Sequence, residues 1–359
     1  METVEIAVIG GGPAGATFAR LAGHDAHVAL LERQPADAAV TSGKCCGGLL
    51  SPDAQCSLAR LGLTLPLEVL VDPQIFAVRT MDLAMEQERY YSRSYVNMDR
   101  RKFDRWLLSL LPDNVILKQG AHCQRIERDR NGFCITYRQE RETHTLHTKT
   151  VVGADGGYSL VRRTFFPDVP MRRYAALQEW VPSAGQSPFY GALFDRKLTD
   201  CYGWLISKDH HLIVGGAFPL DHANERFVQM KDKLVARGLS LSFPQRREGC
   251  VVCRPTGPSQ FCTGESDVFL LGEAAGFISP SSLQGISYAL DSGRLLAQAL
   301  ATGMQGAQAR YHRLTLSLRM QLLGKLAKNP VLYTPAVRRW ILTSGVGSVP
   351  MPIKNPAKA

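Results

Sequence analysis

The chain has 359 residues, 45% of them hydrophobic, and its 42 Lys and Arg outnumber its 32 Asp and Glu, which gives a formal net charge of +10. This length can bury one large core or two ordinary ones, and no apolar run reaches the roughly 18 to 20 residues that a membrane-spanning helix needs. The 9 cysteines are an odd number and no signal peptide precedes the first strand, so we expect a reducing, cytoplasmic compartment without a disulfide framework.

The N-terminal segment predicts a strand, a tight turn, a helix and a second strand: "VEIAVIG", "GGGPAGATFARLAG" and "HVALLE". At the first turn stands Gly10-x-Gly12-x-x-Gly15, the spacing with which a dinucleotide pyrophosphate is held at a helix N-terminus. Glu32 ends the second strand, where a carboxylate accepts hydrogen bonds from a ribose and disfavours a 2′-phosphate. The expected cofactor contacts here are Gly10, Gly12, Pro13, Ala14, Gly15, Glu32 and Arg33.

Three later segments contain further candidate cofactor residues. Residues 99 to 111 ("DRRKFDRWLLSLL") predict an amphipathic helix that begins near Arg100, and residues 150 to 163 ("TVVGADGGYSLVRR") predict a buried strand that ends beside Asp155. Residues 267 to 300 predict another buried strand, a turn at Gly272 and Glu273, and a loop that leads into a helix near Gly285.

With its G-x-G-x-x-G, R-x-x-F-D, D-G and late G-E-A-A-G motifs in this order, the chain resembles the flavoprotein class that includes p-hydroxybenzoate hydroxylase and the geranylgeranyl reductases. "KCCGGLLSPDAQ", "NMDRRKFDRWL", "CYGWLISKD" and "GEAAGFISPSSLQGISYALDS" are most similar to the CbrA-type bacterial proteins of the geranylgeranyl reductase family. The resemblance runs from Val4 to about Trp340 and implies FAD as the cofactor, with Arg100, Asp155, Gly272 and Glu273 directed at it. Glu273 departs from the family, which has aspartate there, and Gln284 replaces an acidic residue found in many relatives.

The fold class that follows is α/β: an FAD-binding Rossmann domain like that of p-hydroxybenzoate hydroxylase, interleaved with a mostly antiparallel substrate domain and followed by a helical tail. We assign 1–72, 97–171 and 259–305 to the FAD-binding domain. Alternating patterns and turn residues assign 73–96 and 172–258 to the substrate domain. The remaining segment, 306–359, forms the basic C-terminal tail.

The resemblance directs the N–H groups of Gly285 and Ile286, at the start of the late helix, toward the pyrimidine edge of the flavin ring. Positive helix termini stabilise anions, so this placement favours the reduced, anionic flavin and hydride delivery. The competing interpretation is that Gly285 only caps the helix.

The cluster "SGKCCGGLL" (42 to 50) follows the second strand, where a cysteine-glycine segment of the geranylgeranyl reductases lies beside the flavin ring. The resemblance makes that cysteine Cys46, with Gly47 allowing the backbone to lie flat against the ring. Lys44 would lower the thiol pKa or bind an acidic substrate group. We expect Cys45 to be structural, with its side chain facing away from Cys46. A small buried thiol beside an exposed lysine is the simpler alternative.

The strand "CYGWLIS" places Tyr202, Trp204 and Ile206 on one face, after which "KDHH" is expected to turn the chain back. The resemblance makes this face a wall of the substrate cavity, although aromatic residues on a strand often belong only to a core. Cys250-x-x-Cys253 lies on a strand, where positions i and i+3 face opposite ways, so we expect no metal site. No Ser-His-Asp or H-E-x-x-H pattern supports hydrolysis.

These interpretations lead to an FAD-dependent oxidoreductase that reduces carbon–carbon double bonds of an isoprenoid or other lipid-like, hydrophobic small molecule. Cys46, Tyr202 or a water would supply the proton, and Trp204 completes the predicted catalytic set. The alternatives are a flavin-dependent monooxygenase or halogenase, which share the fold, and a non-catalytic flavin-binding protein at a membrane. No second dinucleotide fingerprint is present, so the electron donor is NAD(P)H bound transiently or a redox protein.

The tail accounts for the basic excess, with ten Lys or Arg and no Asp or Glu from Ser292 onward. A solvated basic face is one interpretation, and peripheral binding to an anionic membrane on its inner face is the other. The second rests on a row of Tyr311, Leu314, Leu318, Leu322 and Leu326 at helical spacing, with Arg310, Arg313 and Lys328 on its flank. It predicts that membrane binding depends on Lys328, Arg338 and Arg339. Nucleic acid is not expected, because no aromatic-plus-basic motif or zinc-finger spacing accompanies the charge.

Overall fold

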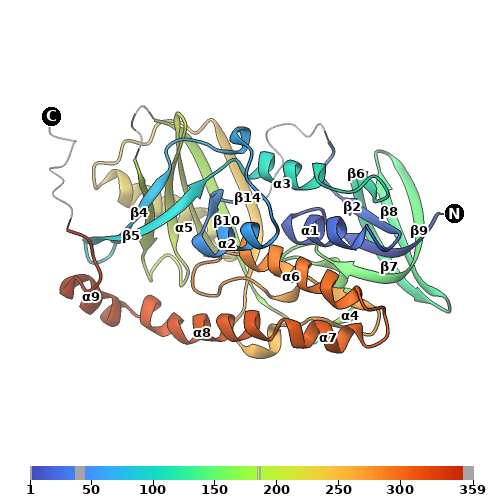
Figure 1. Cartoon of the computed structure of the whole chain (residues 1–359). Helices are drawn as coiled ribbons and strands as arrows, with labels where there is room; N and C mark the ends of the chain where they lie inside the picture. Colours follow the sequence, from blue (N-terminus) through green and yellow to red (C-terminus); the bar gives the residue numbers. More distant parts are fainter. Residues whose placement is uncertain (1, 37–44, 184, 186, 351–359) are drawn as a thin grey trace.

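A computed structural model of the chain describes residues 2–36, 45–183, 185 and 187–350. Within these ranges the chain forms two eight-stranded β-sheets, with helices packed on the first sheet and at the far side of the second. Figure 1 shows the two sheets side by side, with the C-terminal helices running along one side of both.

The first sheet has a parallel centre in the order β16-β9-β1-β2-β6, which is the arrangement expected of a dinucleotide-binding domain. Apolar runs such as "VALLE" make its central strands, because a parallel strand covered on both faces must be apolar throughout. Its strands are β1 (Glu2–Ile9), β2 (Val28–Glu32), β6 (Ile116–Gln119), β7 (Ala121–Asp129), β8 (Gly132–Gln139), β9 (Glu142–Gly153), β15 (Gly264–Glu265) and β16 (Val268–Leu270).

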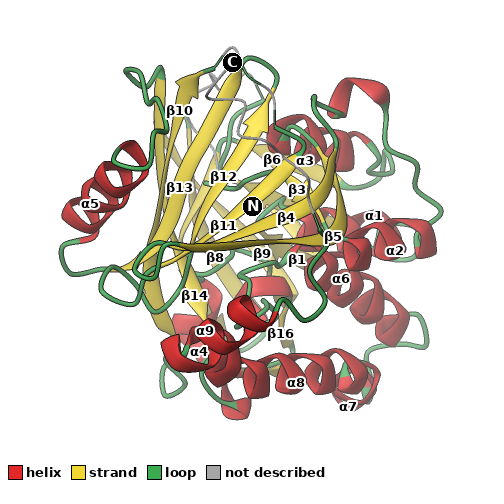
Figure 2. Cartoon of the chain, turned by 90° about the vertical axis from the view of Figure 1, so that its left-hand side faces the viewer, coloured by secondary structure: helices red, strands yellow, loops and turns green. Residues whose placement is uncertain are grey.

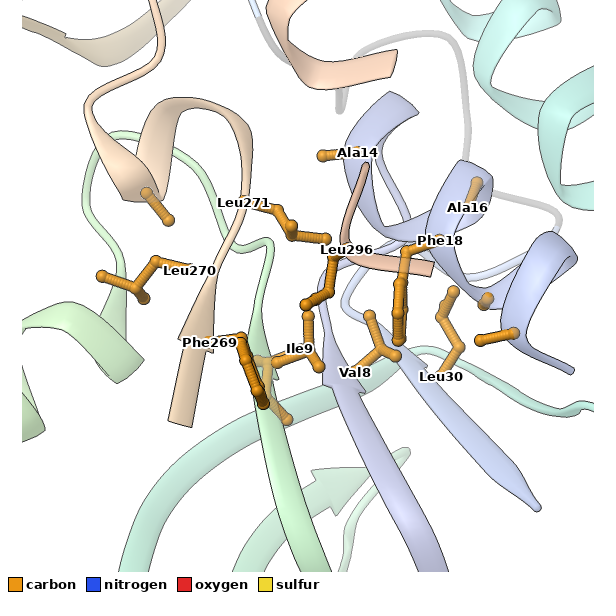
Figure 3. Close-up of a cluster of buried hydrophobic side chains, with 14 of the residues drawn as sticks. Val8, Ile9, Ala14, Ala16, Phe18, Leu30, Phe269, Leu270, Leu271 and Leu296 are labelled. Carbon is orange, nitrogen blue, oxygen red and sulfur yellow. The ribbon is translucent and has the colours of Figure 1, made fainter. Parts of the chain in front are cut away.

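Helices α1 (Pro13–Ala22) and α6 (Ile286–Leu300) pack against each other and against this sheet. Figure 3 shows Phe18 of α1 and Leu296 of α6 beside Val8, Ile9 and Phe269 of the sheet. Their backbones approach closely, since a Cβ at Gly293 would lie 2.6 Å from Ala14 O. The other helices that precede the C-terminal segment are α2 (Pro52–Arg60), α3 (Arg100–Ser109), α4 (Leu160–Phe165) and α5 (Ala223–Val235). Short 3₁₀ turns lie at Leu67–Val69, Pro258–Gln260 and Gly272–Ala275.

The second sheet is mostly antiparallel, in the order β14-β10-β13-β12-β11-β4-β5-β3. One face of this sheet encloses a core that α5 covers (Figure 2). A second buried cluster, rich in aromatic side chains of this sheet, also includes Ile278 and Tyr333 from the C-terminal part of the chain. Its strands are β3 (Leu49–Leu50), β4 (Ile75–Asp82), β5 (Gln87–Asn97), β10 (Arg172–Pro182), β11 (Phe189–Phe194), β12 (Gly203–Lys208), β13 (His211–Pro219) and β14 (Arg246–Arg254).

The C-terminal segment forms α7 (Ala307–Leu314), α8 (Leu316–Tyr333) and α9 (Pro335–Ser344), which run from the first sheet to the second. The apolar row proposed to meet a membrane is wrong as a lipid-facing surface, because Tyr311, Leu318 and Leu322 are buried in the core of the first domain. The prediction that Arg338 belongs to a membrane-binding surface is also wrong. Arg338 is buried, and its Nε lies 2.6 Å from Oδ2 of Asp82 on β4.

Across the described ranges, the helices are all too short or too polar to cross a membrane.

Candidate functional site

A cavity of about 1090 Å³ lies where the two sheets meet, and it brings together most of the predicted site residues. Gly15 and Gly272 do not line it, and Lys44 lies outside the described residues. The predicted residues in its wall are Gly10, Gly12, Pro13, Ala14, Glu32, Arg33, Cys46, Gly47, Arg100, Asp155, Tyr202, Trp204, Glu273, Gly285 and Ile286.

Glycine stands at the three positions of the fingerprint for different physical reasons. Gly10 has φ of +104°, a conformation that side chains rarely adopt, and a Cβ there would lie 2.5 Å from Ala154 O. A Cβ at Gly15 would lie 1.9 Å from Gly10 O, so Gly15 lets helix and strand pack closely. At Gly12 a Cβ would meet nothing within 4 Å, which means that this glycine opens onto the cavity.

Glu32 and Asp155 place two carboxylates in the wall. Oε2 of Glu32 accepts a hydrogen bond from Gly11 N at 2.6 Å, and Oε1 accepts one from Gln34 N at 2.7 Å. Oδ2 of Asp155 accepts a bond from Leu160 N at 2.6 Å. Burial raises the pKa of both carboxyl groups.

This wall fits the dinucleotide part of FAD. The N-terminus of α1 has no side-chain cap and no acidic residue in its first turn, so its positive end is directed at the open space beside Gly12. Oδ1 of Asp155 is buried and accepts no hydrogen bond from the described residues. An uncapped helix terminus, an open glycine and an unpartnered buried oxygen are what a bound ligand with anionic and hydroxyl groups would complete.

The loop that contains Cys46 sits at the junction of the two sheets. The Cys46 Sγ atom accepts hydrogen bonds from Gly48 N at 3.4 Å and from Arg100 Nη1 at 3.5 Å. Arg100 also donates from Nε to Asp104 Oδ1 at 2.8 Å, and this pairing raises its pKa against the opposing effect of burial. A half-buried thiol therefore lies against a fixed guanidinium in the cavity wall.

The glycines of this loop are required by the protein itself. A Cβ at Gly47 would lie 2.4 Å from Ile206 Cδ1, and one at Gly48, where φ is +62°, would lie 2.3 Å from Met98 O. The loop thus lies directly against β12 and the end of β5, which is a different reason from the predicted contact with a flat ring.

Lys208 does not line the cavity but supports the loop that contains Cys46, a role that the sequence did not reveal because "KDHH" was expected to be a turn. It is instead the last residue of β12, it is 3% exposed, and burial lowers its pKa to about 8. Its Nζ donates to Asn97 Oδ1 at 2.6 Å, Met98 O at 2.7 Å and Gly48 O at 3.2 Å. Lys208 therefore holds the backbone of the loop behind Cys46 in place through Gly48 O. In the sequence, the only indication of this role is the two-residue period of the strand, which places Lys208 on the same face as Tyr202, Trp204 and Ile206.

The aromatic wall follows the predicted alternation, with Tyr202, Trp204 and Ile206 all lining the cavity. The Tyr202 hydroxyl donates to Ser282 O at 2.5 Å, in the loop that precedes α6. Burial raises the pKa of Tyr202, so its hydroxyl stays protonated at neutral pH. Tyr190 adds a further aromatic ring that the sequence did not single out.

A buried polar network holds Trp204 in place. Trp204 Nε1 donates to Gln178 Oε1 at 3.2 Å, and Gln178 Nε2 donates to Glu248 Oε2 at 2.6 Å. Oε1 of Glu248 forms ion pairs with Arg101 at 3.1 Å and with Arg246 at 2.7 Å. The network joins α3 of the first domain to three strands of the second, so it couples the aromatic wall to the cofactor side.

Glu273, the departure from the family pattern, reaches the edge of the second sheet. Its Oε1 accepts a hydrogen bond from Cys253 N at 2.9 Å, and the side chain is 8% exposed. Gln284, the other departure, donates from Nε2 to the Tyr95 hydroxyl at 3.1 Å. Both substitutions thus form contacts between segments of the two domains.

The start of α6 lies in the same wall. Its N-cap, Gly285, has no side-chain hydrogen bond, and the first turn contains no acidic residue. A second helix N-terminus is therefore directed at the cavity, in the place where the sequence predicted it.

Cys250 and Cys253 face opposite ways, as predicted. The Cys250 Sγ atom lies 3.7 Å from Cys45 O, and the Cys253 Sγ atom lies 2.8 Å from Gly157 O. Among the described residues, no group of three or more His, Cys, Asp or Glu is placed to hold a metal ion.

Known proteins resemble the whole chain. No family model matches it. It is 42% identical over 350 residues to protein CbrA of Escherichia coli O9:H4 (strain HS), which covers 98% of this chain and 96% of that protein.

Two solved structures share its fold. A geranylgeranyl bacteriochlorophyll reductase-like protein from Thermoplasma acidophilum has a TM-score of 0.83 at 19% identity, covering 99% of this chain and 95% of that one. PqsL from Pseudomonas aeruginosa, a probable FAD-dependent monooxygenase, has a TM-score of 0.69 at 16% identity, covering 97% and 100%. These likenesses confirm the predicted fold class, and the identity to CbrA confirms the predicted resemblance: the chain belongs to the CbrA family.

Proposed function

We propose that the chain is an FAD-dependent oxidoreductase that reduces carbon–carbon double bonds of an isoprenoid or other lipid-like substrate. The observation that carries the proposal is a single cavity that joins a dinucleotide fingerprint to an aromatic wall. When bound, FAD would supply hydride transfer, which no amino-acid side chain performs. The protein's part is to bind, to orient and to provide a proton.

The first domain's residues account for binding. The uncapped N-terminus of α1 would hold the pyrophosphate beside Gly12, and the Glu32 carboxylate would accept hydrogen bonds from a ribose. The N-terminus of α6, at Gly285 and Ile286, would place positive charge near the ring. Arg33 and Arg100 add fixed positive charge to the same wall.

The second sheet accounts for the substrate class. Tyr190, Tyr202, Trp204 and Ile206 present apolar surface to the cavity, and such surface favours an apolar molecule over a sugar or an amino acid. Two groups in this wall can provide a proton: the Tyr202 hydroxyl and the Cys46 thiol. Tyr202 is protonated at neutral pH, because burial raises its pKa.

The test compares Cys46→Ser with Cys45→Ser as a matched control. Both proteins are purified with their flavin, reduced without oxygen and mixed with polyprenyl lipids that contain several double bonds. We expect product heavier by two hydrogen atoms from the wild type and from Cys45→Ser, with slower turnover in Cys46→Ser at unchanged FAD content. Equal rates for all three would remove Cys46 from the catalytic set, and no saturated product from any would refute the proposed reaction.

Oxygen distinguishes the alternative reactions. PqsL shares the fold and is a probable FAD-dependent monooxygenase, so oxygen chemistry is the second candidate. Rapid peroxide formation on reoxidation together with a hydroxylated or halogenated product would favour it. Slow reoxidation by every acceptor would favour a flavin-binding protein without turnover. The electron donor, NAD(P)H or a redox protein, is identified by which of them bleaches the flavin absorbance.

A further inference from the structure

Two cysteines that are 205 positions apart meet in the cavity wall. Cys45 lies directly before Cys46, and Cys250 lies on β14 of the second sheet. The Cys250 thiol donates a hydrogen bond to Cys45 O at 3.7 Å, and the neighbouring Cys250 thiol together with burial raises the pKa of the Cys45 thiol. Both residues line the cavity. Two cysteines that are in contact across a cavity wall can form a disulfide where their Cβ atoms come within about 4.5 Å of each other.

Neighbouring cysteines are directed elsewhere. The Cys46 Sγ atom accepts its hydrogen bonds from Gly48 N and Arg100 Nη1. Cys253 lies on the opposite face of the strand from Cys250 and contacts Gly157 O. The geometry thus selects Cys45 and Cys250 among the cysteines near the cavity.

Access differs between the two thiols. Cys45 is 6% exposed, whereas Cys250 is only partly buried. An oxidant that enters the cavity therefore reaches Cys250 first, and Cys45 is in place to resolve the product.

We propose that Cys45 and Cys250 are a redox-active thiol pair that closes to a disulfide when a peroxide enters the cavity. The Cys250 sulfur attacks one peroxide oxygen, the O–O bond breaks, and the other oxygen leaves as water after taking a proton. The Cys45 sulfur then attacks the resulting sulfenic acid, the S–O bond breaks, and a second water leaves. In total, two thiols lose two electrons and two protons, and one hydrogen peroxide becomes two waters.

The disulfide would fix one end of the loop that contains Cys46. The other end is already held by Lys208, whose Nζ donates to Gly48 O. Oxidation would therefore attach the loop to both β12 and β14 and set the width of the cavity between the two sheets. The inference concerns the thiols alone and stands whether or not the proposed alkene reduction is correct.

The experiment treats the purified protein, with its flavin, with hydrogen peroxide and then alkylates the remaining thiols. Peptide mapping without reductant should show one cross-linked pair that joins the segment of Cys45 to that of Cys250, and reductant should release it. Because Cys45 and Cys46 are adjacent and share a peptide, variants must assign the bond. We expect the cross-link to persist in Cys46→Ser and Cys253→Ser and to vanish in Cys45→Ser and Cys250→Ser.

Two results would overturn the inference. One is full alkylation of both thiols in the oxidised wild type at peroxide levels that already oxidise the exposed Cys56. The other is a cross-link that survives Cys45→Ser and is lost in Cys46→Ser, which would show that Cys46, and not Cys45, forms the disulfide. Circular dichroism and flavin absorbance of each variant show that it is folded, and the wild-type result does not depend on any variant.

Discussion

Replacing Gly12 with valine separates cofactor binding from folding. The residue has φ of −68° and ψ of −177°, extended values that valine adopts readily. A Cβ there meets no atom within 4 Å, so the side chain would enter the cavity and displace nothing of the protein. The folded chain should accept the substitution, while the space beside the N-terminus of α1 is filled.

The expected changes in stability and in FAD affinity follow from the backbone angles of Gly12 and from the open space beside it. Loss of a glycine N-cap costs roughly 1 kcal/mol, and the reduced freedom of the unfolded chain returns about half of that, so the stability change should stay near 1 kcal/mol or below. A pyrophosphate kept away from the helix terminus would lose at least one or two charge-assisted hydrogen bonds, about 3 kcal/mol in all. That corresponds to FAD binding weaker by about a hundredfold or more.

The assay measures the FAD content of the purified protein from its visible spectrum, the dissociation constant by fluorescence titration, and the urea midpoint of the apoprotein. Gly15→Ala is the matched control, because its Cβ would lie 1.9 Å from Gly10 O and should destabilise the fold by about 1 to 3 kcal/mol. Full FAD occupancy in Gly12→Val would refute the assignment of the pyrophosphate site. Loss of the fold in Gly12→Val would refute the argument that the glycine faces open space.

Three further predictions concern charges. Arg338→Gln should lower the unfolding free energy by about 3 kcal/mol, because it leaves the buried Asp82 carboxylate without its ion-pair partner. Urea denaturation measures this change, and the double variant Asp82→Asn/Arg338→Gln should recover part of the loss. A urea midpoint of Arg338→Gln equal to that of the wild type would contradict the pairing. Burial lowers the pKa of Lys208 from 10.5 to about 8, so the unfolded chain binds this proton more tightly and stability should rise between about pH 8 and 10.5, by up to roughly 3 kcal/mol. The same urea midpoints across that range should rise less in Lys208→Met, and an equal rise in both proteins would exclude Lys208 as the cause. In the tail, Leu316, Met320 and Lys328 are exposed on α8, and Arg339 and Trp340 are exposed on α9. We therefore predict salt-sensitive co-sedimentation with anionic vesicles that weakens roughly tenfold or more in Lys328→Gln/Arg339→Gln, whereas binding that ignores lipid charge would leave a solvated basic face as the explanation.

The sequence by itself determined the features that depend on local backbone requirements. Gly10 and Gly15 are needed because no other residue fits the turn and the helix contact, and such needs are written in the spacing of a short segment. The apolar run of β2 and the alternation of Tyr202 and Trp204 were likewise readable, since a strand's period is fixed by its backbone. The fold class and the family followed from these motifs.

Only the tertiary structure decided the contacts between distant segments. Lys208 was expected in a turn, yet it is buried beside Gly48, because three oxygen atoms accept hydrogen bonds from its Nζ atom and offset the cost of burying an amine. The pattern of the tail gave the apolar row correctly but not the surface that it covers, since periodicity does not distinguish a protein core from a membrane. The pairings of Cys45 with Cys250 and of Arg338 with Asp82 join residues more than 200 positions apart, and only the packing of the two sheets brings such residues together.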